Sequence, residues 1–188
     1  MGNFALSFAN RYIENRSLAP DRKLLIIRAA VGGTGFIDKR WGMEDDLYLR
    51  MMEMIKTALA LNPANKIKAI LWHQGETDSY EGNTIENHYT SLKTLVDSIH
   101  QTFNCPEVPF ICGDFVNPWR AENLTNCLPV LDAMRKLCAD LSNAAFIETT
   151  DLESNSVRIG NDDTIHFCRE ALNILGNRYY EAYARLKG

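Results

Sequence analysis

Leu71-Trp72-His73-Gln74-Gly75-Glu76-Thr77-Asp78 is the stretch that decides the fold, because an apolar run over residues 67–72 ends there in polar side chains and a glycine. Apolar runs of this length before a glycine are typical of buried strands. In open α/β sheets, the residues just beyond the carboxyl end of a strand line the ligand crevice. The stretch therefore predicts a site that contains a histidine, an amide and two carboxylates.

Helical and strand patterns alternate along the rest of the chain. Apolar residues at helical spacing predict helices over residues 4–15, 46–61, 84–103, 128–141 and 167–186. Continuous apolar runs predict strands over residues 24–30, 67–72, 108–115 and 145–148. Strands separated by helices form right-handed βαβ units. We therefore expect a single domain over residues 1–188, built as a three-layer α/β/α sandwich around a parallel sheet.

Composition and charge narrow the function classes. The chain has 188 residues, of which 46% are hydrophobic, so a single domain with an ample core is expected. Its formal net charge of −4 disfavours a nucleic-acid partner. No apolar run approaches the roughly 20 residues that a membrane-spanning helix needs, so no membrane partner is predicted.

Glycines follow the first predicted strand, in the sequence Gly32-Gly33-Thr34-Gly35. Glycine allows a sharp turn and a close approach of backbone to ligand. The backbone N–H groups of Gly32 and Gly33 are therefore candidates to stabilise an oxyanion. The alternative interpretation is an ordinary turn between a strand and a helix.

A carboxylate and a histidine precede the last predicted helix as Asp163 and His166. A general-base histidine needs an acceptor on Nδ1, which fixes its tautomer and stabilises the imidazolium. The alternative is that Asp162 or Asp163 only caps the helix. The position of the pair, after the last strand, favours the catalytic interpretation, with His166 as base and Asp163 as its orienting partner.

The polar residues of the quoted stretch allow two kinds of site. Gln74 offers an amide N–H to an oxyanion or substrate, while Glu76 and Asp78 are suited to hold the loop by accepting backbone N–H groups. His73 and Glu76, together with His88, would form part of a metal site. Because no further histidine or cysteine completes a usual ligand set, we predict neither a metal nor a cofactor.

These motifs resemble the SGNH hydrolase superfamily, in its branch of sialate O-acetylesterases and acetylxylan-esterase-like carbohydrate esterases. The stretch from Trp72 to Asp78 is similar to the branch signature W-x-Q-G-E-x-D, and residues 30–35 and 163–167 are similar to two further family blocks. The resemblance implies a flavodoxin-like fold that removes O-linked acetyl groups from sugars without a metal. It further implies that Gly33 and Gln74 bind the oxyanion, that Asp163 and His166 complete a triad, and that the partner is a small or oligosaccharide O-acetylated substrate.

One family block has no counterpart in the sequence. It is the G-x-S-N element after the first strand of the family, which carries the nucleophile. None of the serines follows a predicted strand in a glycine-flanked turn; they are Ser7, Ser17, Ser79, Ser91, Ser98, Ser142, Ser154 and Ser156. We therefore expect the nucleophile and its central strand to lie outside this chain. The alternative is an inactive remnant that binds carbohydrate or acts as a scaffold.

Overall fold

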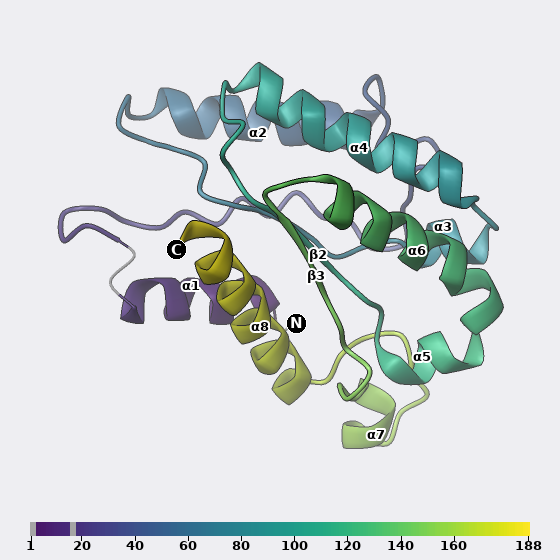
Figure 1. Ribbon diagram of the computed structural model, residues 1–188. Coiled ribbons are helices and arrows are strands. Elements are labelled where there is room, and N and C mark those ends of the chain that lie inside the picture. Colours follow the sequence, from purple (N-terminus) through teal and green to yellow (C-terminus); the bar gives the residue numbers. More distant parts are fainter. Residues whose placement is uncertain (1–2, 16–17) are drawn as a thin grey trace.

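A parallel sheet forms the centre of the computed structural model, which describes residues 3–15 and 18–188 (Figure 1). Its strands are β1 (Ile70–Trp72), β2 (Phe110–Gly113) and β3 (Ala144–Ile147), in the order β1-β2-β3. Ile70 pairs with Phe110, which in turn pairs with Ala144, and both ladders are parallel. The carboxyl ends of the three strands therefore lie at one edge, as the sequence predicted.

Helices cover both faces of this sheet. One face carries α1 (Phe4–Glu14) and α8 (Arg169–Lys187), and the other carries α4 (Ile85–Thr102) and α6 (Leu124–Asp140), with α2 (Asp46–Ala60) beside α4 (Figure 1). Three short helices follow the carboxyl ends of the strands: α3 (Glu76–Tyr80), α5 (Asn117–Glu122) and α7 (Asn155–Ile159). The arrangement confirms the predicted three-layer α/β/α sandwich.

Two hydrophobic clusters hold the layers together. Between the sheet and α4 and α6, Leu92, Val96 and Leu131 are completely buried. Each such side chain stabilises the fold by roughly 1.5–3 kcal/mol relative to an exposed one. Between the sheet and α1 and α8, the cluster is aromatic, with Tyr12 and Tyr179 among its most buried rings.

The strand predicted over residues 24–30 is wrong. This segment carries no regular structure, and Leu25 is 65% exposed. Ile27 and Ala29 still pack against the cluster beneath α2 and α4, so the apolar pattern correctly marked contact with the core. An apolar run becomes a strand only where a neighbouring backbone pairs with it. Among the described residues, no backbone hydrogen bond joins this segment to β1.

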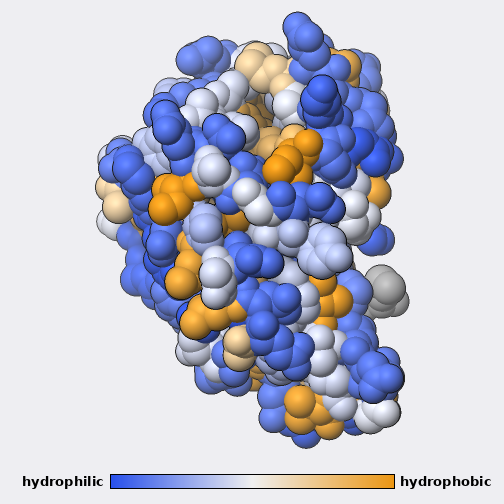
Figure 2. All heavy atoms as spheres, turned by 90° about the vertical axis from the view of Figure 1, so that its right-hand side faces the viewer, coloured by the Kyte–Doolittle hydropathy of each residue, from blue (hydrophilic) through white to orange (hydrophobic). Residues whose placement is uncertain are grey.

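The remaining helices and strands lie within a few residues of their predicted bounds. The short helices α3, α5 and α7 were not predicted. Asn117 and Pro118 begin α5, where proline suits the first turn. None of the described helices is both long enough and apolar enough to cross a membrane. On the side of the molecule shown in Figure 2, hydrophilic residues predominate and hydrophobic ones are scattered among them.

Candidate functional site

Asp163 and His166 form a hydrogen-bonded pair in the loop between α7 and α8. Nδ1 of His166 lies 2.9 Å from Oδ1 of Asp163, and the His166 backbone N–H donates to the same oxygen at 3.1 Å. The His166 side chain is 64% exposed, and its Nε2 has no hydrogen-bond partner among the described residues. A histidine held at Nδ1 with a free Nε2 has the geometry of a general base.

A further polar side chain supports this pair. The Asn155 amide donates to Oδ2 of Asp163 at 2.9 Å, while the Asn155 backbone N–H donates to the carbonyl of His166. Partial burial raises the pKa of Asp163, but the hydrogen bonds from Asn155 and His166 outweigh it and hold that pKa below its usual value. Asn155 was missed in the sequence, because no local motif marks it as a partner of Asp163.

Replacing Asp163 by alanine is expected to change the tautomer of neutral His166. The change removes the carboxylate oxygen that holds the proton on Nδ1, and a neutral imidazole without such an acceptor carries its proton mainly on Nε2. Long-range ¹H–¹⁵N NMR at alkaline pH should show Nδ1–H in the parent and a gain of Nε2–H in Asp163→Ala. Asp162→Ala, at an exposed neighbour, is the control; the same tautomer in all three proteins would contradict the pairing.

The glycine turn and the signature stretch meet on the other side of the site. The Gln74 amide donates through Nε2 to the carbonyl of Thr34. Gly33, one residue earlier, has a φ of 68°, in the left-handed region that glycine adopts without strain. Gly32 and Gly33 are both exposed, so their backbone is open to a ligand. The structure thus brings together Gln74 and the Gly32-Gly33 turn, two of the predicted oxyanion elements.

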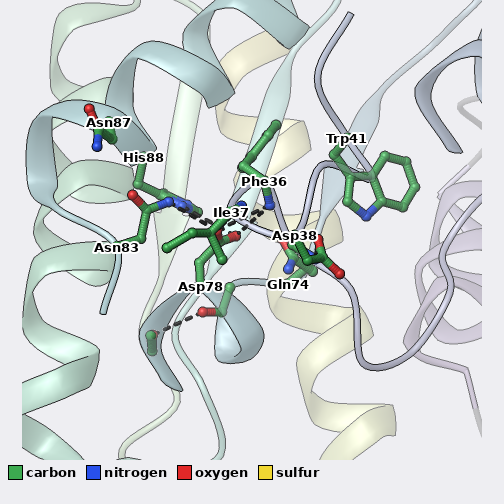
Figure 3. A network of polar contacts seen from close by, with 12 residues as sticks. Phe36, Ile37, Asp38, Trp41, Gln74, Asp78, Asn83, Asn87 and His88 are labelled. Carbon is green, nitrogen blue, oxygen red and sulfur yellow. Dashed lines mark hydrogen bonds and ion pairs between the residues drawn. The ribbon is translucent and has the colours of Figure 1, made fainter. Parts of the chain in front are cut away.

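Asp78 lies beneath this turn as a fully buried carboxylate (Figure 3). It accepts the backbone N–H groups of Phe36 and Ile37, at 3.1 and 3.0 Å. The prediction that acidic residues of the signature stretch hold the loop is therefore confirmed for Asp78. Glu76 has a different environment: burial raises its pKa, and the nearby His166 opposes this rise.

The two halves of the site adjoin through their neighbouring residues. The ring of His73, which precedes Gln74, lies 5.3 Å from the ring of Phe167, which follows His166. The signature stretch and the loop that carries His166 therefore lie next to each other. The convergence of Gly33, Gln74, Asp163 and His166 on one substrate, and their roles in catalysis, stay a prediction.

A third polar group stands at the end of β2. Asp114 is completely buried, with Nε of Arg120 and Nη2 of Arg135 each 3.4 Å from its Oδ2. Burial raises the pKa of Asp114 to about 6, although both arginines oppose the shift. This cluster places two cations beside the sheet edge that carries the site.

Neither a nucleophile nor a metal cluster is evident within residues 3–15 and 18–188. No described serine hydroxyl bonds to His166: Ser79 is buried and donates to the Gly75 carbonyl, and Ser7 bonds to Asn173. Ser17 lies outside the described residues. The described part of the chain has no group of three His, Cys, Asp or Glu residues that could hold a metal ion.

Comparison with known proteins agrees with this geometry. Residues 3–185 match the family described as carbohydrate esterase, sialic acid-specific acetylesterase. The chain belongs to this carbohydrate esterase family. The match covers the glycine turn, the signature stretch and the Asp163–His166 pair, so the resemblance drawn from these motifs is confirmed.

Two relatives show how much of a family member the chain represents. A probable carbohydrate esterase of Arabidopsis thaliana is 26% identical over 184 residues, which are 95% of this chain and 62% of the relative. A probable 9-O-acetyl-N-acetylneuraminic acid deacetylase of Escherichia coli (strain K12) is 29% identical over 89 residues, 43% of this chain and 27% of the relative. The chain thus spans about three fifths of the first relative and less of the second.

Two solved structures share the fold. An X-ray structure of a protein from Arabidopsis thaliana matches with a TM-score of 0.75 and 25% identity, over 95% of this chain and 66% of that one. The crystal structure of NanS matches with a TM-score of 0.79 and 19% identity, over 97% of this chain and 70% of that one. The NanS likeness concerns the fold alone, and it extends across both layers of helices.

Proposed function

We propose that this chain carries the base and the oxyanion elements of an esterase that removes O-linked acetyl groups from sugars. The observation that carries the proposal is His166, held at Nδ1 by Asp163 with Nε2 unpartnered and exposed. The substrate class follows from the family and from the deacetylase named among its relatives. The serine nucleophile is proposed to lie outside these 188 residues.

The proposed reaction is a two-step acyl transfer. The serine hydroxyl attacks the acetyl carbonyl while His166 accepts its proton at Nε2, and Asp163 stabilises the resulting imidazolium. The Gly33 N–H and the Gln74 amide stabilise the oxyanion. Collapse breaks the bond to the sugar oxygen, which takes the proton from His166, and water then releases acetate by the same route.

A second function is favoured by one observation. Because no hydroxyl of a described serine bonds to His166, the described residues alone offer no serine for the acyl-enzyme route. The alternative is a domain that binds O-acetylated sugars or acts as a scaffold without hydrolysing them. The coding sequence before Met1 separates the two functions: an in-frame G-x-S-N block supports the esterase, and an in-frame stop supports the alternative.

The purified chain is expected to hydrolyse p-nitrophenyl acetate at no more than a trace rate. His166 can still activate water, but loss of the nucleophile leaves serine proteases only roughly 10³–10⁴-fold above the uncatalysed rate. The measurement compares the parent with His166→Ala, and with Asp162→Ala as an exposed neighbouring control. Full esterase turnover that His166→Ala abolishes would place the nucleophile within this chain, and fluorophosphonate labelling would then identify the residue.

A further inference from the structure

Asp78 is a buried charge without a cationic partner. Its side chain is completely buried, and within the described part of the chain the ionisable base within 4 Å is His88, whose Nδ1 lies 3.6 Å from Oδ2. Burial lowers the pKa of His88 to about 4, so this imidazole is neutral at neutral pH. A buried carboxylate costs several kcal/mol unless hydrogen bonds compensate it.

The compensation comes from the segment that follows the glycine turn (Figure 3). The Phe36 N–H reaches both carboxylate oxygens at 3.1 Å, and the Ile37 N–H reaches Oδ1 at 3.0 Å. The Asn83 amide adds a further donor at 2.9 Å. Gly35 is shaped for this contact, since a Cβ there would lie 2.8 Å from Oδ2.

A second connection joins the same two segments. The Gln74 amide donates to the carbonyl of Thr34, whose hydroxyl donates to the Val31 carbonyl at 2.8 Å and accepts Nε1–H of Trp41 at 2.9 Å. The connections of Gln74 and Asp78 to residues 34–37 lie on either side of Gly35. Gly33 and Gln74 belong to segments far apart in the sequence, so these connections determine how their N–H groups lie relative to each other.

We propose that Asp78 is a positioning residue of the oxyanion site: by anchoring residues 36 and 37 to the signature stretch, it sets the Gly33 N–H and the Gln74 amide at the spacing that a single acetyl oxygen requires. This role rests on the proposed function. Oxyanion donors stabilise a developing charge only when they are held in place before the reaction. A carboxylate is suited to this task because it accepts several N–H groups at once, whereas an asparagine presents one oxygen and an NH₂ group that opposes the backbone donors.

Acetate, a reaction product, tests the proposal in the chain as it exists. In the parent, titration with sodium acetate should shift the NMR signals of the Gly33 N–H and the Gln74 side-chain amide with one common Kd. In Asp78→Asn, the affinity should fall about tenfold, and the two signals should no longer report the same Kd. Asp97→Asn, which removes an ion pair with Lys93 on α4, should leave the titration unchanged.

The acetate titrations distinguish a positioning role of Asp78 from a purely structural one. Near-UV circular dichroism shows whether Asp78→Asn is folded; a folded variant that binds acetate like the parent would overturn the proposal and leave Asp78 a purely structural role. If Asp78→Asn does not fold, Gly35→Ala decides, because its Cβ would lie 2.8 Å from Oδ2 and should push the carboxylate away from the Phe36 N–H, which weakens acetate binding; unchanged binding then overturns the proposal. A parent that does not respond to acetate would refute the oxyanion site itself, and with it both this role and that part of the proposed function.

Discussion

Gly176→Ala is expected to destabilise the protein by about 2 kcal/mol or more, although alanine is the better helix former. In a helix interior, alanine is favoured over glycine by about 1 kcal/mol. Here, however, a Cβ would lie 2.2 Å from the carbonyl oxygen of Phe4, 2.6 Å from Cβ of Ser7 and 2.9 Å from the Phe8 nitrogen. Two of these atoms are backbone and cannot move aside unless α1 shifts on α8. Overpacking costs typically about 1–3 kcal/mol and occasionally more. A backbone contact as short as 2.2 Å belongs at the upper end of this range, so about 2 kcal/mol or more remains after the gain in helix propensity is subtracted.

The measurement is urea unfolding of the parent and of Gly176→Ala. Glu181→Ala, at an exposed position on the same helix, is the control and should change the free energy of unfolding by less than about 0.5 kcal/mol. A midpoint for Gly176→Ala at or above that of the parent would mean that α1 is not packed as described. The consequence extends to the site, because Phe4 contacts the rings of His73 and Tyr179.

His73 is expected to make the protein sensitive to acid. Its Nδ1 lies 3.0 Å from the hydroxyl oxygen of Tyr179, and this hydroxyl donates to the Trp72 carbonyl at 2.8 Å. Nδ1 is therefore the protonated nitrogen. The other nitrogen, Nε2, is buried without a hydrogen-bond partner within the described residues. Burial lowers the pKa of His73 to about 4, from 6.5 in an unperturbed histidine.

The direction in which stability changes with pH follows from proton uptake. Between pH 6.5 and 4 the unfolded chain binds a proton at His73 that the folded chain does not, so stability is lost as the pH falls through this range. The loss from this residue alone should reach about 3 kcal/mol near pH 4. His88 acts in the same direction, while the raised pKa of Asp114 acts in the opposite one.

The variant His73→Asn isolates the contribution of His73 to the loss of stability at low pH. His73→Asn keeps an N–H near Tyr179 but does not titrate, so its free energy of unfolding should fall less steeply with decreasing pH than that of the parent. Urea unfolding at a series of pH values gives both curves. Parallel curves would show that His73 is accessible to protons in the folded state.

The residues of the site differ in how far they could be predicted from the sequence. Gln74 was predicted because polar residues directly after a buried run lie at the carboxyl edge of a parallel sheet. Asp163 and His166 were predicted from their spacing before the last helix, and the Gly32-Gly33 turn from its glycines. These inferences need only the local pattern and the chain direction. The support from Asn155 and from Tyr179 was not predictable in the same way: Asn155 lies eight residues before Asp163 and outside any motif, and Tyr179 reaches His73 from 106 residues away.

Sequence periodicity alone indicated the longer helices, the three paired strands and the buried side of each longer helix. Helical spacing and apolar runs indicate which faces of a segment are buried. Because this pattern depends only on neighbouring residues, most helices and strands lie near their predicted bounds. The signature stretch with the Asp163–His166 pair likewise sufficed to indicate the esterase family.

Tertiary structure alone decided which backbones pair and how closely the elements approach. Residues 24–30 have the apolar run of a strand, but within the described part of the chain no neighbouring backbone pairs with them. A ladder needs a second backbone, and no local pattern supplies it. By helix propensity alone, Gly176 would be expected to destabilise α8. In the structure, its lack of a Cβ allows α1 and α8 to pack in contact. The Asp78 carboxylate could be expected to bind backbone N–H groups, but only folding brought those of Phe36 and Ile37 to it, because hydrogen bonds between distant segments depend on where the packed layers place them.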